Sequence, residues 1–235
     1  MKNMLVASTS TLHGGSYLEY ILPTLQNHFE GIKEIIFIPY ARPSGISHDA
    51  YTEKVQEAFD KIDIKVKGLH SFDNPKEALS NAKGIFTGGG NTFLLVKKLY
   101  EEEVLQPLRN TILQGTPYLG TSAGSNICGV NIRTTNDMPI VYPPSFDALG
   151  LLPFNINPHY LDPDVNSKHM GETRETRIHE FHSQNNIPVV GLREGSWLEI
   201  KGDHISLRGE LEARIFEQGK KPREVPTGTE LSDLK

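Results

Sequence analysis

A serine enclosed by glycines is the strongest chemical signal in this sequence. The segment Gly120-Thr121-Ser122-Ala123-Gly124 has the pattern G-x-S-x-G, and it lies between a predicted strand and a predicted helix. In such a nucleophile elbow, a tight turn of small residues holds the serine hydroxyl exposed at the end of the strand. The next backbone N–H, that of Ala123, then points at the oxyanion that forms on an attacked carbonyl. Because small-residue turns also produce this pattern by chance, its context carries more weight than the pattern itself.

A second glycine-rich turn, Gly88-Gly89-Gly90-Asn91, also joins a predicted strand to a predicted helix. Such a loop brings backbone N–H groups close to a ligand at a helix N-terminus, where an anion is favoured. The turn has neither the Lys-Ser/Thr of a P-loop nor the spacing G-x-G-x-x-G, so it is a weak nucleotide signal. Gly89 and Gly90 are therefore candidate oxyanion-hole donors, and Asn91 is a candidate substrate-binding residue. The alternative is a helix-start turn that only needs positive φ angles.

A serine nucleophile requires a base, and nine histidines are candidates. His159 follows the largely apolar run 151–156, which should place it at the carboxyl end of a strand, where open α/β sheets have their sites. A solvated loop histidine is the alternative reading. His179 and His182 have a spacing that suits a metal pair, but no carboxylate-rich motif accompanies them, so we expect no metal site there.

Two carboxylates are candidates for the group that orients His159. Asp137 lies in Thr134-Thr135-Asn136-Asp137-Met138-Pro139, and Glu194 lies in Gly191-Leu192-Arg193-Glu194-Gly195. Both segments have the composition of loops, in which surface carboxylates are common without any catalytic role. The residues alone do not decide between them.

The elements that position these residues follow from the hydrophobic pattern. Short β-branched or apolar runs alternate with helical patterns, which is typical of an α/β fold with a mostly parallel sheet and helices on both faces. The expected strand and helix pairs are 4–7 and 17–28, 34–38 and 48–59, 62–66 and 76–81, 84–87 and 91–100, and 117–120 and 121–128. Asn74-Pro75 has the residues of an N-cap followed by proline at the first helical position.

The pattern changes after residue 128. A Pro- and Asn-rich stretch, 133–164, predicts loops, and a helix is expected over 173–182. Four closing strands are expected at 188–191, 197–200, 204–207 and 213–216. The tail from Lys220 is expected to be frayed. Without a linker, repeat or low-complexity segment, residues 1–235 are predicted to form a single domain.

Composition narrows the class of protein. Hydrophobic residues make up 37% and charged residues 23% of the 235 residues, as in ordinary globular proteins. A net charge of −5 without a basic run argues against nucleic acid or an anionic membrane as partner. The first apolar run is too short for a signal peptide, and the single cysteine, Cys128, cannot form an internal disulfide. These features predict a cytoplasmic protein.

Five blocks of the sequence, in this order, resemble the peptidase E (α-aspartyl dipeptidase) family. The resemblance extends from Met4 to about Phe216 and is much more specific than a single G-x-S-x-G. The blocks are Gly88-Gly89-Gly90-Asn91-Thr92-Phe93, Gly120-Thr121-Ser122-Ala123-Gly124, Ile132-Arg133-Thr134-Thr135-Asn136-Asp137-Met138-Pro139-Ile140, Ile156-Asn157-Pro158-His159 and Gly171-Glu172-Thr173-Arg174-Glu175.

The resemblance implies a fold related to the class I glutamine amidotransferase domain, with serine at the elbow. It implies a serine peptidase that releases N-terminal Asp from small peptides without a metal or organic cofactor. Ser122, His159 and Glu194 match the Ser-His-Glu triad of the family, while Asp137 matches another position of its catalytic machinery. Arg174 matches the residue expected to bind the carboxylate of the substrate's Asp side chain. A homodimer is compatible with the sequence.

Three other functions share parts of this pattern. An α/β-hydrolase esterase would use the same elbow, with His13-Gly14-Gly15 as oxyanion loop and His204 as base. A cyanophycinase-like peptidase would cut β-aspartyl links instead. Outside enzymes, an amidotransferase-like binding module would carry an inert Ser122.

Overall fold

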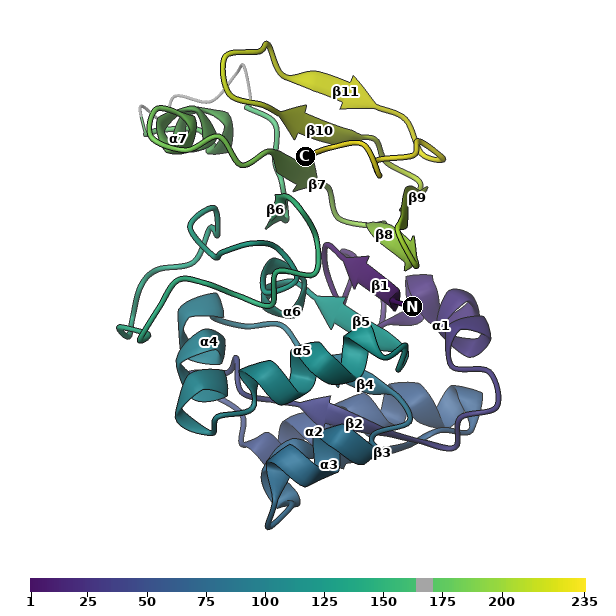
Figure 1. The fold of residues 1–235 in the computed structure, drawn as a ribbon. Coiled ribbons are helices and arrows are strands. Elements are labelled where there is room, and N and C mark those ends of the chain that lie inside the picture. The colour runs from purple at the N-terminus through teal and green to yellow at the C-terminus, as the bar shows by residue number, and fades with distance from the viewer. Residues whose placement is uncertain (164–170) are drawn as a thin grey trace.

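The computed structural model describes residues 1–163 and 171–235, and it confirms the α/β fold (Figure 1). A seven-stranded sheet has the order β3-β2-β4-β5-β1-β8-β9, and a four-stranded sheet has the order β11-β10-β7-β6. In the larger sheet, the strands from β3 to β1 run parallel, while β8 and β9 are antiparallel additions at one edge. The sheet is therefore mostly parallel, as the alternating pattern predicts.

The strands are short, and most are buried. Their bounds are β1 Asn3–Ala7, β2 Glu34–Ile38, β3 Lys65–Gly68, β4 Ile85–Thr87, β5 Tyr118–Thr121, β6 Asn155–Pro158, β7 Val189–Leu192, β8 Ser196–Lys201, β9 His204–Gly209, β10 Ala213–Phe216 and β11 Arg223–Val225. The helices are α1 Leu22–His28, α2 His48–Phe59, α3 Pro75–Asn81, α4 Thr92–Glu101, α5 Leu105–Leu113, α6 Ala123–Asn126 and α7 Arg174–His182.

The two faces of the larger sheet bury two different clusters of side chains. Along β1, Leu5 and Ala7 pack with α1 and α2, whereas Met4 and Val6 pack with α3, α4 and α5. Successive side chains of a strand point to opposite faces, so a strand covered on both faces must be apolar throughout. This requirement explains the continuous apolar run of β1.

The smaller sheet lies beside the carboxyl ends of the parallel strands, with α7 next to it, at the top of Figure 1. β6 and β7 run parallel, with Asn155 opposite Val189 and Pro158 opposite Leu192. Buried residues of β6 and β7 belong to the same hydrophobic cluster as one face of the larger sheet. The two sheets therefore share one hydrophobic core.

Most predicted elements are present, with shifted ends. The predicted cap at Asn74 is confirmed, since its side chain accepts a hydrogen bond from the Glu77 N–H and Pro75 opens α3. Helix α5 was not predicted, although Leu105, Leu108 and Ile112 give it a buried face. The structure describes no helix long and apolar enough to cross a membrane.

The expectation of a frayed tail from Lys220 is wrong. Strand β11 pairs antiparallel with β10, with Val225 opposite Ala213. Leu231 and Leu234 are also buried in the shared core. The tail is mostly polar, so its few apolar residues give little signal in the sequence. These residues hold the tail in place because they are buried and because β10 offers a strand for β11 to pair with.

Close packing at the elbow generates a test of stability. A Cβ atom on Gly124 would lie 2.2 Å from the carbonyl oxygen of Thr87, so Gly124→Ala must push α6 away from β4. We expect a loss of about 1–3 kcal/mol in the free energy of unfolding, or about 2–10 °C in Tm, measured by thermal denaturation. Gly15→Ala is the matched control, because the nearest atom to its Cβ is 3.5 Å away. Equal Tm values for both variants would contradict the packing argument.

Candidate active site

Ser122 occupies a strained turn directly after β5. Its φ of 53° and ψ of −110° lie outside the regions that most residues adopt. The turn is held by a hydrogen bond from the Ser122 N–H to the Ala7 carbonyl (3.2 Å), and α6 starts at the next residue. Strain of this kind persists only where the surroundings fix it, and it is common at functional sites. The predicted strand, elbow and helix around Ser122 are therefore present.

His159 lies within hydrogen-bond distance of Ser122. It follows β6 directly, and its Nε2 is 2.9 Å from the Ser122 Oγ. On its other side, its Nδ1 is 2.6 Å from an Oε1 of Glu194. A carboxylate on one ring nitrogen fixes the imidazole tautomer, so that the other nitrogen can take a proton from the serine. The three side chains form one continuous chain of polar contacts.

The pairing of β6 with β7 explains why Glu194 reaches the imidazole. Since Pro158 lies opposite Leu192, both strands end at the same level, and the residues that follow them lie side by side. Asp137 does not contact His159 in the described contacts. Its Oδ2 accepts from the Thr92 N–H (2.7 Å) and the Thr135 hydroxyl (3.1 Å), and thereby holds the start of α4. Of the two candidate carboxylates, Glu194 has the orienting geometry.

The glycine-rich turn lies against Ser122. A Cβ on Gly89 would be 3.0 Å from the Ser122 Cβ, so a side chain there would crowd the nucleophile. In the part of the chain that the structure describes, the N–H groups of Gly89, Gly90 and Ala123 donate no hydrogen bond. Unpartnered N–H groups beside a nucleophile are what an oxyanion hole requires. Their role as oxyanion donors stays a prediction.

Asn91 serves as the cap of α4. Its Oδ1 accepts from the Leu94 N–H (3.0 Å), and its Nδ2 donates to the Met138 carbonyl (2.8 Å). A capping amide of this type stabilises the start of a helix. The described contacts therefore assign Asn91 to the shape of the turn, and its substrate-binding role stays a prediction.

A pocket of about 310 Å³ opens beside the imidazole. Its lining residues are His159, Tyr160, Leu161, Asp162, Arg174, Arg193, Glu194 and Leu211. Among the described residues, the buried Nη1 of Arg174 has no hydrogen-bond partner. Burial lowers the pKa of this guanidinium, while the nearby charge of Glu194 acts in the opposite direction. Since arginine stays charged, the pocket presents a poorly solvated cation that an anionic ligand would satisfy.

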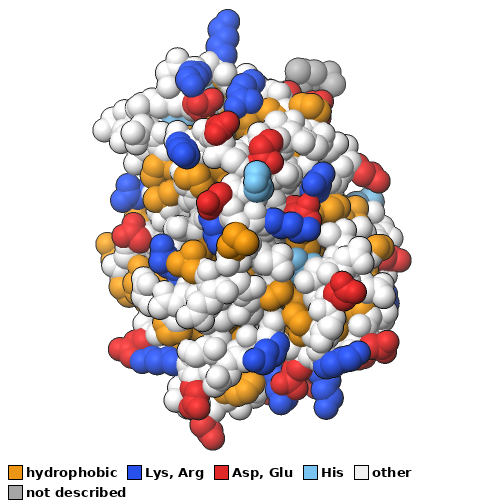
Figure 2. Space-filling model, turned by 45° about the vertical axis from the view of Figure 1, so that its right-hand side comes forward, with side chains coloured by type: hydrophobic (Ala, Val, Ile, Leu, Met, Phe, Trp, Pro, Cys, Tyr) orange, Lys and Arg blue, Asp and Glu red, His pale blue; other side chains and the backbone are white. Residues whose placement is uncertain are grey.

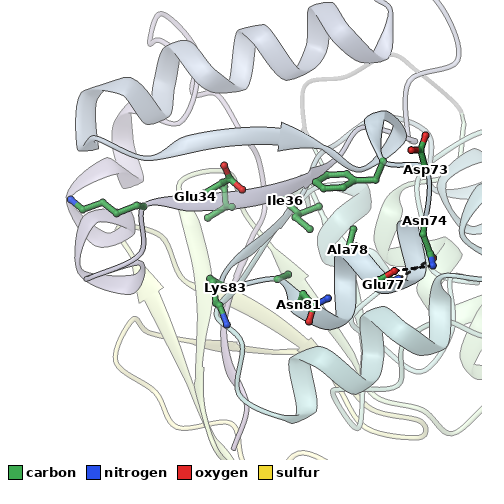
Figure 3. Close-up of a pocket in the computed structure, with 12 residues that line it drawn as sticks. Glu34, Ile36, Asp73, Asn74, Glu77, Ala78, Asn81 and Lys83 are labelled. Atoms are coloured by element: carbon green, nitrogen blue, oxygen red, sulfur yellow. Dashed lines mark hydrogen bonds between the residues drawn. The ribbon is translucent and has the colours of Figure 1, made fainter.

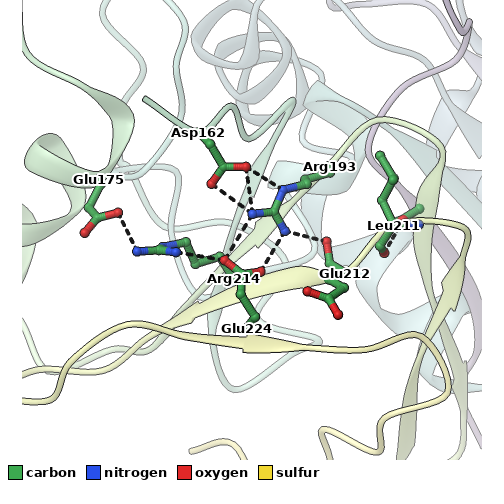
Figure 4. A network of polar contacts seen from close by, with 8 residues as sticks. Asp162, Glu175, Arg193, Leu211, Glu212, Arg214 and Glu224 are labelled. Atoms are coloured by element: carbon green, nitrogen blue, oxygen red, sulfur yellow. Dashed lines mark hydrogen bonds and ion pairs between the residues drawn. The ribbon is translucent and has the colours of Figure 1, made fainter. Parts of the chain in front are cut away.

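Other charges near this pocket are paired (Figure 4). Arg193 binds Asp162 and Glu224 through several hydrogen bonds of 2.8–3.1 Å, and Arg214 binds Glu224 and Glu175. These hydrogen bonds raise the pKa of Arg193. Burial alone would raise the pKa of Glu224, but bonds from both arginines lower it. Sequence reasoning missed this network because its members lie up to 31 residues from Arg193 along the chain.

The surroundings of the other described histidines and of the cysteine do not indicate a second site for nucleophilic catalysis. His182 contacts the Ile187 carbonyl, and His179 lies 3.6 Å from Glu175. Burial raises the pKa of the Cys128 thiol to about 12, so this cysteine is a poor nucleophile. A larger cavity of about 600 Å³ lies over β2 and α3, and its described lining residues include no serine, cysteine or histidine (Figure 3).

The esterase assignment of the base does not fit the sheet register. Ser122 follows Thr121, which lies opposite Ala7 at the end of β1. His204 lies opposite Lys201, and Lys201 lies opposite Asn3 at the start of β1. His204 is therefore at the opposite end of the sheet from the elbow.

On the face shown in Figure 2, acidic and basic side chains are interspersed, without a large patch of one charge.

Comparisons with known proteins find similar proteins over nearly the full length of this chain. The model of the family described as "Peptidase family S51" matches residues 4–208. A protein of Streptomyces coelicolor named "Peptidase E" is 48% identical over 99% of this chain and 94% of its own length. A Drosophila melanogaster protein named "Probable alpha-aspartyl dipeptidase" is 44% identical over 99% of this chain and 97% of its own length. The crystal structure of a peptidase from an acI-B1 Actinobacterium has a similar fold, with a TM-score of 0.75 and 18% sequence identity. The match covers 98% of this chain and 96% of that protein's chain.

The two carboxylates can be distinguished by the reactivity of Ser122. We expect Glu194→Gln to slow labelling of Ser122 by a fluorophosphonate about 10²- to 10⁴-fold, because the amide no longer fixes the required imidazole tautomer. Asp137→Asn should slow it less, because the contacts of Asp137 are with Thr92 and Thr135. Labelling rates of purified variants, followed by mass spectrometry, provide the measurement. A larger loss in the Asp137 variant would reverse the assignment.

Proposed function

The chain belongs to peptidase family S51, and on this premise we propose that it is a serine-type dipeptidase that releases N-terminal aspartate from α-linked Asp-X dipeptides. The observation that carries the proposal is the contact chain Ser122–His159–Glu194, next to a pocket in which the buried Nη1 of Arg174 has no hydrogen-bond partner among the described residues. Similar proteins named peptidase E and alpha-aspartyl dipeptidase support this choice of substrate.

In the proposed first half-reaction, the Ser122 Oγ attacks the carbonyl carbon of the N-terminal Asp. Its proton passes to the Nε2 of His159, which lies 2.9 Å away. The N–H groups of Ala123 and of Gly89 or Gly90 stabilise the oxyanion. When the tetrahedral intermediate collapses, the imidazolium gives its proton to the leaving amine, and an aspartyl ester on Ser122 remains.

In the second half-reaction, water takes the place of the leaving amine. His159 accepts a proton from the water as it attacks the ester carbonyl, and it then protonates the Ser122 oxygen as free Asp departs. Glu194 holds the imidazole in one tautomer throughout and stabilises its positive charge. Every proton transfer in this scheme uses the chain's own side chains and water.

Selection of aspartate is proposed to depend on Arg174. A guanidinium can bind a carboxylate through two parallel hydrogen bonds, which a neutral amide cannot match. Asp162, Glu175 and Glu224 are paired with Arg193 or Arg214, so they do not neutralise Arg174 in the described structure. In the described structure, the buried Nη1 of Arg174 is therefore available to the carboxylate of an incoming substrate.

Organisation and location are part of the same proposal. A hydrophobic cluster that includes residues of both sheets supports a single domain over residues 1–235. One buried cysteine is consistent with action in the cytosol. The proposed substrate is a small peptide, and neither nucleic acid nor membrane takes part in the reaction.

Replacement of the nucleophile tests the covalent mechanism. We expect Ser122→Ala to lower the rate of Asp-Leu hydrolysis about 10⁴- to 10⁶-fold, because no acyl-enzyme can form. Tm should change by no more than about 2 °C, because the side chain lies in a turn and not in the packed core. Retention of more than a few percent of activity would exclude Ser122 as the nucleophile.

Substrate selection can be tested with paired dipeptides. We expect kcat/KM for Asp-Leu to exceed that for Asn-Leu at least thirtyfold, because the amide leaves Arg174 unpaired at a cost of about 2–5 kcal/mol. Arg174→Ala should abolish most of this preference. Arg177→Ala is the matched control, since Arg177 is an exposed arginine on the same helix.

The outcomes separate the competing interpretations. If Arg174→Ala lowers activity on both dipeptides equally, Arg174 supports Glu194 and another residue reads the carboxylate. Faster cleavage of β-linked Asp-Leu than of α-linked Asp-Leu by the wild-type protein would favour the cyanophycinase-like function. Absence of both activity and Ser122 labelling would favour a binding module.

A further inference from the structure

Ser8, the residue after β1, contacts both segments that carry the partners of Ser122. It is fully buried, and it lies far from them in sequence. Its Oγ accepts a hydrogen bond from the His159 N–H (2.8 Å) and donates one to the Leu192 carbonyl (2.7 Å). A single hydroxyl therefore connects the larger sheet to the ends of β6 and β7.

The bond to His159 satisfies a backbone group that the sheet does not pair. His159 follows the last residue of β6 and has a φ of 53°, in the left-handed region that non-glycine residues seldom adopt. A buried N–H needs a partner, and in the described structure the Ser8 hydroxyl is its acceptor. Without that acceptor, the backbone would tend to relax toward another conformation and turn the imidazole away from Ser122.

The bond to Leu192 acts on the other segment. Leu192 is the last residue of β7, two positions before Glu194, and its carbonyl also accepts from the Tyr160 N–H (3.1 Å). The Ser8 hydroxyl and the residue after His159 thus meet at one carbonyl oxygen. Movement of this point would change the distance between His159 and Glu194.

The hydroxyl is not required to continue the strand. The backbone N–H of Ser8 bonds to the Ser196 carbonyl (3.1 Å), which continues the pairing of β1 with β8. Any residue could make that backbone bond. The side chain, by contrast, makes both of its bonds to the segments that carry His159 and Glu194.

We propose that Ser8 is a positioning residue of the hydrolytic site, and that its hydroxyl sets the geometry of His159 and Glu194 relative to Ser122. This inference rests on the proposed function only for the reaction that Ser8 supports. The hydrogen bonds of Ser8 are observed independently of that function. Ser8 touches no reacting atom, so it acts through its neighbours. A misplacement of about 1 Å in a catalytic group can cost on the order of 100-fold in rate, so loss of the hydroxyl should mainly lower kcat.

An isosteric pair of variants isolates the hydroxyl from packing. Ser8→Thr keeps the hydroxyl and adds a methyl group at a buried site, whereas Ser8→Val has nearly the shape of Ser8→Thr with a second methyl group in place of the hydroxyl. We expect Ser8→Val and Ser8→Ala to lower kcat for Asp-Leu about 10- to 100-fold with KM within about threefold of wild type. Ser8→Thr should retain at least about tenfold more kcat than Ser8→Val.

Thr111→Val is the control for the loss of a buried hydroxyl. The Thr111 hydroxyl donates to the Leu79 carbonyl between α5 and α3, and it contacts no residue of the proposed site. We expect this variant to keep the wild-type kcat. Thermal denaturation of each variant shows whether the protein is folded, and Ser8→Ala serves if Ser8→Val does not fold.

Fluorophosphonate labelling gives a readout that does not depend on the peptide substrate. In this reaction the Ser122 Oγ forms a bond to phosphorus, the P–F bond breaks, fluoride leaves, and the serine proton passes to His159. Labelling of Ser8→Ala should be about 10- to 100-fold slower than that of wild type, with Ser8→Thr again closer to wild type than Ser8→Val. If wild type labels but does not cleave Asp-Leu, the proposed substrate fails while this test of Ser8 still stands.

Three results would overturn the inference. The first is a kcat and labelling rate within threefold of wild type in a folded Ser8→Ala protein. The second is an equal loss in Ser8→Thr and Ser8→Val, which would mean that packing and not the hydroxyl is responsible. The third is a rise in KM with unchanged kcat, which would place the effect on substrate binding.

Discussion

The register of two parallel strand pairs is the constraint on which the rest of the site depends. Ala7 lies opposite Thr121, so Ser8 and Ser122 leave β1 and β5 at the same level. Pro158 lies opposite Leu192, so the segments with His159 and Glu194 leave β6 and β7 together. A shift of one residue in either pair would turn a whole strand over and separate the groups. The reactive side chains are short, and strand register brings them within reach of one another.

Tight backbone contacts fix the turns at these strand ends. Gly124 lies so close to the Thr87 carbonyl that a side chain has no room, and a side chain on Gly89 would crowd Ser122. Two non-glycine residues of the site, Ser122 and His159, have positive φ angles. Conformations of this kind cost free energy and persist where surrounding contacts over-determine them. At Ser122 the packing of Gly89 supplies such a contact, and at His159 the hydrogen bond to the buried Ser8 hydroxyl supplies it.

The charged side chains around the pocket are also held in place by contacts between distant segments. Arg193 and Arg214 pair with acidic groups from three separate segments, while the buried Nη1 of Arg174 finds no partner in the part of the chain that the structure describes. Ion pairs of this kind contribute modestly to stability when exposed, but they also hold loops in place. Strand β11 supplies Glu224 to the network, so the C-terminal segment that looked frayed in sequence helps to shape the pocket.

The sequence by itself determined the alternating α/β pattern, the elbow at Ser122, the glycine-rich turn and the candidate base His159, because these depend on local spacing and turn chemistry. It did not identify α5 or the ordered tail, whose apolar positions are sparse and gain meaning only from the surface that they cover. The choice of Glu194 over Asp137 as the partner of His159 in the structure was decided by tertiary structure. Both carboxylates lie in loops of similar composition, and only the pairing of β6 with β7 brings one of them to the imidazole.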